Sequence, residues 1–122
     1  MFRNNAGTSH NGPNKQVYAN TLLDRWHVGD FSSVDYTISA DFDVDNKELI
    51  KVAITASRDR ASIVVYARNN TLRDLLTVSA VVNDSHVDII LNPATTSPAD
   101  ANLGVKVIYT AQYFHNQNPL TP

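Results

Sequence analysis

Three aspartates at alternate positions, Asp41, Asp43 and Asp45, have the spacing in this sequence that is closest to a metal-binding loop. A D-x-D-x-D start is typical of an EF-hand calcium loop, in which carboxylate oxygens coordinate the ion. The rest of that loop is missing, because its sixth position is Asn46 rather than glycine and its twelfth is Val52 rather than glutamate. The carboxylates fit better as the polar face of a strand, so we predict no metal site and no cofactor.

The other residue types that carry out catalysis are scattered. The chain has no cysteine, and no two of its histidines, His10, His27, His86 and His115, are close in sequence. A site made from them would depend on the fold to bring them together. No serine lies in a G-x-S-x-G elbow, and no glycine-rich phosphate or dinucleotide motif occurs. We therefore predict no catalytic residues and no enzymatic activity.

Charge and hydropathy exclude two classes of partner. Ten basic residues stand against twelve acidic ones, for a formal net charge of −2, and neither sign clusters. A basic surface for nucleic acid is therefore not expected. No stretch approaches the roughly 20 apolar residues of a membrane helix, and residues 1–16 lack the apolar segment of a signal peptide. We expect neither a nucleic acid nor a membrane as partner.

Aromatic residues are the remaining candidates for binding. Such residues at strand spacing belong more often to a core or a subunit interface than to a ligand platform. The weaker alternative is that the candidate residues named below, together with Tyr109, form a platform on which a glycan binds. The candidate partner contacts are Tyr18, Trp26, Tyr113 and Phe114.

A period of two residues organises the segment that must position these side chains. From Val34 to Asp45, every even position is apolar and every odd position is polar, which is typical of a strand with one buried face. The segment around Tyr18 to Trp26 also has helical spacing, so one helical turn there stays an alternative to a strand. The pattern predicts about seven strands, near residues 22–28, 34–45, 50–56, 63–67, 76–82, 87–91 and 105–113.

These strands, with short polar turns such as Asn83-Asp84, predict an all-β fold. We expect an antiparallel β-sandwich of jelly-roll or immunoglobulin-like type with an extended N-terminal arm. Residues 1–16 form the arm, 17–114 the sandwich domain and 115–122 a C-terminal tail. The arm and the tail are rich in Asn, Pro, Thr and Ser, so we expect partner subunits to hold them.

The order of these segments resembles the small β-domain proteins found in virions of T4-like marine cyanophages. The resemblance covers about residues 23–114. It lies in the opening LLDRWHVGDFSSVDYTISADF, the following ELIKVAITASRDRASIVVYARNN, and the closing LTVSAVVNDSHVDIILNPAT with VKVIYTAQYF. The chain differs from that family by using Asn, Asp and Arg where glycines are expected at several turns. None of these motifs is catalytic.

The resemblance implies a bacteriophage virion structural protein, a non-enzymatic assembly component of the tail, baseplate or fibre region. A capsid decoration or cement protein on the head surface is the first alternative, and a carbohydrate-binding adhesin module is the second. The implied location is the virion, assembled in the host cytoplasm. The implied partners are other virion proteins and copies of the chain itself, as a homo-oligomer.

Overall fold

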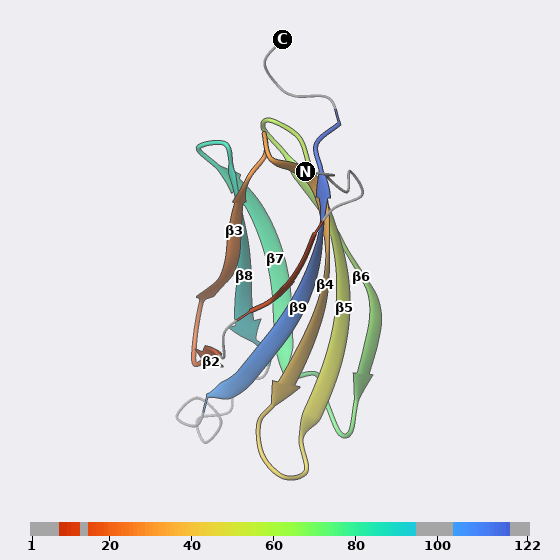
Figure 1. The fold of residues 1–122 in the computed structure, drawn as a ribbon. Helices are drawn as coiled ribbons and strands as arrows, with labels where there is room; N and C mark the ends of the chain where they lie inside the picture. Colours follow the sequence, from red (N-terminus) through yellow and green to blue (C-terminus); the bar gives the residue numbers. More distant parts are fainter. Residues whose placement is uncertain (1–7, 13–14, 95–103, 118–122) are drawn as a thin grey trace.

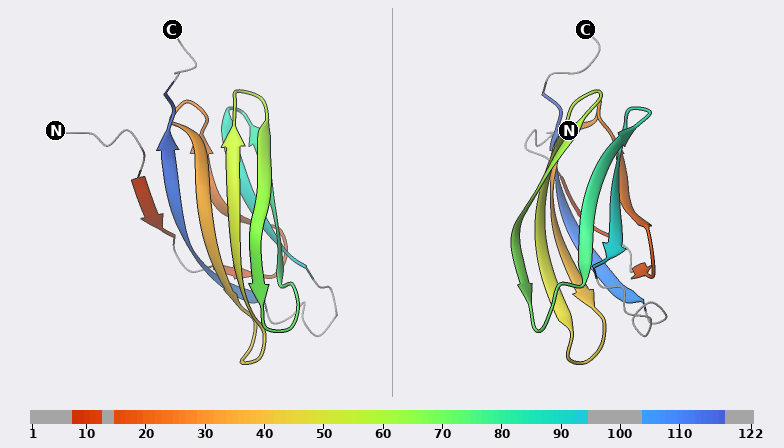
Figure 2. Two further views of the ribbon diagram at one scale, coloured as in Figure 1. Left: turned by 90° about the vertical axis from the view of Figure 1, so that its right-hand side faces the viewer. Right: turned by 180° about the vertical axis from the view of Figure 1, so that it is seen from behind.

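The computed structural model of the chain describes residues 8–12, 15–94 and 104–117. Two antiparallel sheets face one another in a sandwich, as Figures 1 and 2 show, so the predicted all-β fold is confirmed. Among these residues there is no helix, and hence none long and apolar enough to cross a membrane. The strands are β1 (Thr8–Asn11), β2 (Lys15–Val17), β3 (Thr21–His27), β4 (Phe31–Asp41), β5 (Lys47–Ala56), β6 (Ala61–Asn70), β7 (Leu76–Asn83), β8 (His86–Pro93) and β9 (Val105–His115).

The larger sheet has six strands in the order β1-β9-β4-β5-β6, with β2 also paired to β9. The smaller sheet has three strands in the order β3-β8-β7. Strands β3 to β9 correspond to the seven strands that the alternation predicts, and the segment that also had helical spacing is the strand β3. The smaller sheet has fewer strands and covers only part of the larger one, and β6 and β7 each lie at a border of their sheet.

The core lies between the two sheets and comes from the apolar face of each strand. On β4 and β5, every second residue is fully buried, as with Tyr36, Ile38, Ile50 and Ile54. The facing residues of β3 and β8 in the smaller sheet are also buried, such as Leu23, Trp26 and Ile89. This is the pattern expected of a sandwich in which each sheet has one dry face.

One strand is shorter than its alternation predicts. The pattern indicates a strand to Asp45, but β4 ends at Asp41 and Val44 is 84% exposed. The reason is the Asp43 carboxylate, whose Oδ1 accepts hydrogen bonds from the backbone N–H of Asp45 (2.9 Å) and of Asn46 (2.8 Å). A side chain that satisfies nearby backbone donors in this way closes a turn and competes with the strand. The carboxylate is thus used within the turn.

The turn between β7 and β8 lies one residue later than the predicted pair Asn83-Asp84, because Asn83 still pairs with His86. Its two central residues, Asp84 and Ser85, have φ values of 55° and 63°. Positive φ at both positions is typical of a type I′ turn, whose twist matches that of the flanking strands. This tight turn holds β7 and β8 in an unbroken register from Asn83 and His86 onward.

The N-terminal segment lies along the larger sheet. Strand β1 pairs with the second half of β9, and β2 pairs with its first half. Val17, the last residue of β2, is fully buried. The division into an arm (1–16), a domain (17–114) and a tail (115–122) stays a prediction, and residues 1–7, 13–14 and 118–122 of the two ends lie outside the described residues.

Candidate interaction surfaces

Two of the four predicted partner contacts belong to the core. Trp26 on β3 is 4% exposed and Tyr113 on β9 is 8% exposed. Nε1 of Trp26 donates a hydrogen bond of 3.0 Å to the hydroxyl of Tyr36, and the hydroxyl of Tyr113 donates one of 2.5 Å to Oδ2 of Asp24. The partner contacts predicted at Trp26 and Tyr113 thus have little exposed surface, because both side chains bury their rings and satisfy polar atoms within the chain.

Asp24 is the centre of this buried polar cluster. Its Oδ2 accepts hydrogen bonds from the hydroxyls of Tyr36 (2.8 Å) and Tyr113, and its Oδ1 accepts one from the backbone N–H of Arg25 (2.9 Å). A register shift between Leu22 and Asp24 points the carboxylate inward, since Asp24 pairs with the buried Ile89. The cluster thus links the two sheets through side-chain hydrogen bonds.

Burial controls the ionisation of the tyrosines around Asp24. Loss of solvent and the negative charge of Asp24 raise the pKa of Tyr36 and of Tyr113 far above the ordinary value, and raise that of Tyr109 to about 12. All three phenols therefore stay protonated near neutral pH, and those of Tyr36 and Tyr113 donate hydrogen bonds to Asp24. The cluster is a structural link, and its phenols are not poised to act as bases.

Tyr18 and Phe114 lie nearer the surface. The ring of Tyr18 is 50% exposed and lies against Gly104, whose φ of +69° and close approach to that ring both favour glycine. Phe114, near the end of β9, is half-buried. These two residues stay predicted partner contacts.

The fold brings two of the histidines together. His27 and His86 are opposite one another on β3 and β8, with ring centroids 5.1 Å apart. His27 Nδ1 accepts the backbone N–H of Gly29 (2.9 Å), and His86 Nδ1 lies 3.1 Å from the Asp84 carbonyl. No group of three or more His, Cys, Asp or Glu side chains that could hold a metal ion occurs among the described residues.

Sequence reasoning missed the aromatic residue on the outer face of the larger sheet. Tyr66 is 50% exposed, and its hydroxyl donates a hydrogen bond of 2.7 Å to Oδ1 of Asp35. A register shift between Lys51 and Val52 leaves Tyr66 as the extra residue of β6, so simple alternation does not say where it points. The apolar run from Ile63 to Ala67 was the available signal, because it gives β6 apolar residues on both faces.

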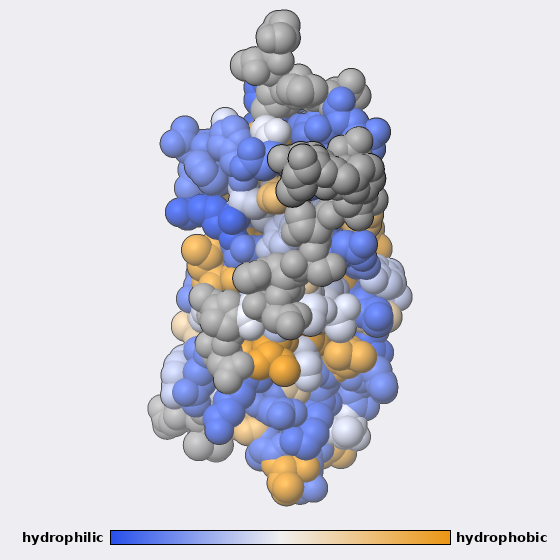
Figure 3. All heavy atoms as spheres, in the orientation of Figure 1, coloured by the Kyte–Doolittle hydropathy of each residue, from blue (hydrophilic) through white to orange (hydrophobic). Residues whose placement is uncertain are grey.

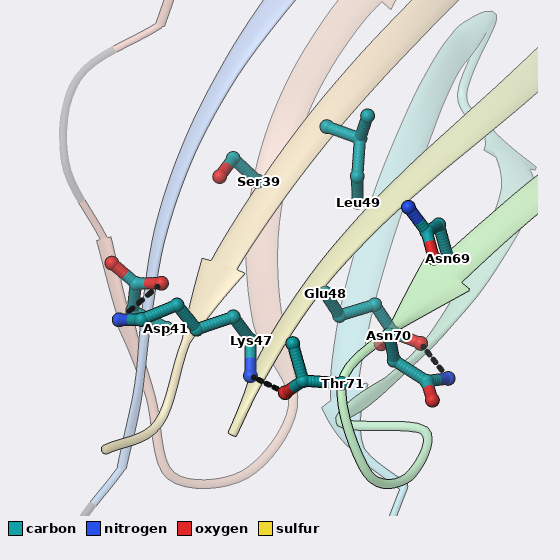
Figure 4. A pocket seen from close by; sticks show the side chains of 8 residues that line it. All are labelled: Ser39, Asp41, Lys47, Glu48, Leu49, Asn69, Asn70 and Thr71. Carbon is teal, nitrogen blue, oxygen red and sulfur yellow. Dashed lines mark hydrogen bonds and ion pairs between the residues drawn. The ribbon is translucent and has the colours of Figure 1, made fainter. Parts of the chain in front are cut away.

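The same outer face carries a shallow groove of about 230 Å³, shown in Figure 4. By the strand registers, Ser39, Leu49 and Asn69 form one row across β4, β5 and β6. Lys47 and Asp41 form an exposed ion pair of 3.3 Å beside this row. The hydroxyl, amide and carboxylate groups suit a polar ligand, and the 39% exposed Leu49 gives a small apolar contact. The groove is lined by Ser39, Asp41, Lys47, Glu48, Leu49, Asn69, Asn70 and Thr71.

Figure 3 shows one face of the molecule, where hydrophilic residues predominate and hydrophobic ones form small separate patches. The larger apolar exposure follows β6 and β7. We call it the open side and define it by the core-facing residues of these two strands that stay partly exposed. By their pairing with buried residues of β5 and β8, these are Ile63, Val65, Val78, Ala80 and Val82.

The open side exists because β6 and β7 are both border strands. Each is hydrogen-bonded to a single neighbour, and Figure 2 shows them at the same side of the sandwich, in different sheets. Val65 is 41% exposed although it pairs with the fully buried Val52. Val64 and Val81, on the opposite faces of the same strands, are 56% and 48% exposed. Exposed apolar surface along two adjacent borders is typical of an interface.

A buried carboxylate fixes the corner between β6 and β7. Oε1 of Glu48 accepts the backbone N–H of Leu75 at 2.8 Å, and Oε2 accepts Nη1 of Arg68 at 2.7 Å. The Glu48 side chain is fully buried, and Asn70 donates a further hydrogen bond to its Oε2. Because these groups hold β7 in place at its start, the open side is a built feature of the fold.

Comparison with known proteins identifies no relative by sequence: no family model matches, and no curated protein matches. Among solved structures, the tailspike protein of Acinetobacter baumannii phage AM24 is similar, with 11% identity and a TM-score of 0.54 over 89% of this chain. The tailspike protein of Acinetobacter phage vB_ApiP_P1 has 12% identity and a TM-score of 0.49 over 86% of the chain. The chain spans 26% and 22% of their lengths. At such identities, the likeness concerns the fold.

Proposed function

We propose that this chain is a structural protein of a bacteriophage virion, belonging to its tail, baseplate or fibre region and acting by assembly without catalysis. The observation that carries the proposal is the fold likeness to one part of the AM24 tailspike, which extends over 89% of this chain and 26% of that protein. A chain whose fold matches about a quarter of a larger tail protein is suited to be one module of an assembly with several parts.

The apolar surface exposed on the open side also supports the proposal, independently of the fold likeness. Core-facing residues such as Val65 and Ala80 stay partly exposed, and large exposed apolar patches mark protein interfaces. The buried polar cluster around Asp24 supports it also, since its phenols are occupied in linking the sheets. The resemblance to virion proteins of marine cyanophages stays a prediction.

The direct test is the position of the protein in a purified particle. Heads and tails are separated and each is analysed by mass spectrometry. Presence in the tail fraction alone supports the proposal, whereas presence on heads alone supports the alternative of a capsid decoration protein. Absence from both fractions contradicts a virion role.

A second candidate function, glycan binding, is favoured by the outer face of the larger sheet. An exposed ring held by a hydrogen bond, as Tyr66 is by Asp35, would stack on a sugar, and the groove beside Ser39 and Asn69 supplies hydroxyl and amide groups. Binding to host surface polysaccharide that is lost in Tyr66→Ala but kept in Tyr18→Ala would support this role. No binding by the unaltered chain would contradict it.

A further inference from the structure

The borders of the two sheets differ in how they are protected from pairing with another chain. A free strand edge presents unpaired N–H and C=O groups, and natural proteins protect it with short strands, charges, prolines or bulges. At one border of the larger sheet, β1 and β2 have four and three residues. At its other border, β6 has a register shift opposite Lys51 and carries Arg68. On the smaller sheet, β3 has a register shift and carries Asp24 and Arg25.

Strand β7 has none of these protections. Its sequence, LTVSAVVN, contains no charge and no proline, and its register with β8 is continuous from Leu76 to Asn83. Arg68 caps its first residue by donating a hydrogen bond of 3.2 Å to the carbonyl of Leu76. Beyond that point, no residue within the described part of the chain pairs with the edge of β7 that faces away from β8. An uncharged edge of this kind, without a bulge or a proline, is a template for pairing with a strand of another chain.

We propose that this partner is β7 of a second copy of the chain, paired antiparallel across a two-fold axis at Ala80. The two smaller sheets would then join into one six-stranded sheet. In this register, each Val78 lies opposite Val82 of the partner subunit and each Ser79 lies opposite Val81 of the partner subunit. This inference rests on the proposed function as an assembly component, and it identifies β7 as the strand through which two copies of the chain associate.

Self-pairing fits β7 for three reasons. An antiparallel pair about Ala80 places core-facing residues opposite core-facing residues, since directly opposed residues share a face. The strand is uncharged, so two copies place no like charges together. The added strand would lie along the open side, where the inner positions Ile63 and Val65 of β6 lack a covering strand. A two-fold interface of this kind uses the same patch on both copies.

The first test is the mass of the full chain in solution, measured by size-exclusion chromatography with light scattering over a range of concentrations. We expect twice the 13.5 kDa chain mass. Ser79→Lys alters an exposed residue, so each chain should fold, yet it inserts a charge into the pairing. This variant should be monomeric where the unaltered chain is dimeric. The matched control, Ser62→Lys on β6, should remain dimeric.

The second test uses the absence of cysteine from the chain. Directly opposed residues of antiparallel strands have Cβ atoms roughly 4.5–5.5 Å apart, which mild strain brings to disulfide distance. Ala80→Cys should therefore form a disulfide between two copies under mild oxidation. The control Ala67→Cys, an exposed position on β6, should not.

Three outcomes would overturn the proposal: a monomer at every concentration, a trimer, or equal cross-linking at positions 80 and 67. A monomer that joins the phage particle by pairing with a strand of another virion protein would identify that protein as the occupant of the β7 edge. In that case the function proposed above stands and the self-pairing fails. A β7-paired dimer that is absent from the particle would support the self-pairing and contradict the proposed virion function.

Discussion

The hydroxyl of Tyr36 on β4 donates a hydrogen bond of 2.8 Å to Oδ2 of Asp24 on β3, and this contact joins the two sheets through the core. The same hydroxyl accepts a hydrogen bond from Nε1 of Trp26. Tyr66 makes a similar phenol–carboxylate contact with Asp35, but on the exposed outer face. The two pairs are therefore a matched test of what burial adds to a hydrogen bond.

Tyr36→Phe should lower the free energy of unfolding by about 1–3 kcal/mol, because the buried N–H of Trp26 would lose its acceptor and Asp24 one of its donors. Tyr66→Phe removes a hydrogen bond of the same chemistry at the surface, where water replaces it, and should change stability far less. Urea unfolding of the two variants measures both values. Equal losses would show that the Asp24 cluster is not a special contribution to the fold.

Glu48 should be the most sensitive charged position. Glu48→Ala removes the fully buried carboxylate that accepts hydrogen bonds from the guanidinium of Arg68 and from the backbone N–H of Leu75. Removing one partner of a buried ion pair costs about 3–5 kcal/mol. Asp41→Ala breaks the exposed pair with Lys47 and should cost less than about 1 kcal/mol. Urea unfolding again gives the measurement, and a small effect at Glu48 would contradict its role at the corner.

Alkaline pH should unfold the chain cooperatively. Burial and Asp24 raise the pKa of Tyr109 to about 12 and raise that of Tyr36 further, whereas an unfolded tyrosine titrates near 10. Above pH 10 the unfolded chain therefore binds fewer protons than the folded chain, so stability falls as pH rises. The stabilisation is fully present below about pH 10.

The measurement is tyrosinate absorbance recorded with circular dichroism as pH rises. We expect most of the absorbance increase to coincide with loss of the β-sheet signal. Gradual ionisation of all five tyrosines near pH 10 with the sheet signal intact would contradict the buried cluster.

The strand positions were predictable from sequence because alternation reports which residues face a core. It did not reveal the register shifts at Leu22 and at Lys51, since a bulge inserts one residue and changes which face the next one takes. Those two irregularities turn Asp24 inward and leave Tyr66 outside the simple alternation. For the same reason, the sequence did not distinguish Trp26, which is buried, from Tyr66, which is exposed.

Gly12→Ala should detach the N-terminal strands from β9. The backbone N–H of Gly12 donates a hydrogen bond of 2.8 Å to the carbonyl of Tyr109, and a Cβ atom at this position would collide with the ring of Tyr109. Because Tyr109 is held in the core by packing against Tyr36, the N-terminal segment would have to move rather than the ring. Hydrogen exchange should then rise at residues 8–12 and along the exposed edge of β9, while β4 and β5 keep their protection.

Gly29→Ala, whose added atom would meet the exposed His27 ring, serves as the control and should leave exchange along β9 unchanged. Unchanged protection of β9 in Gly12→Ala would contradict the close packing of this segment against Tyr109.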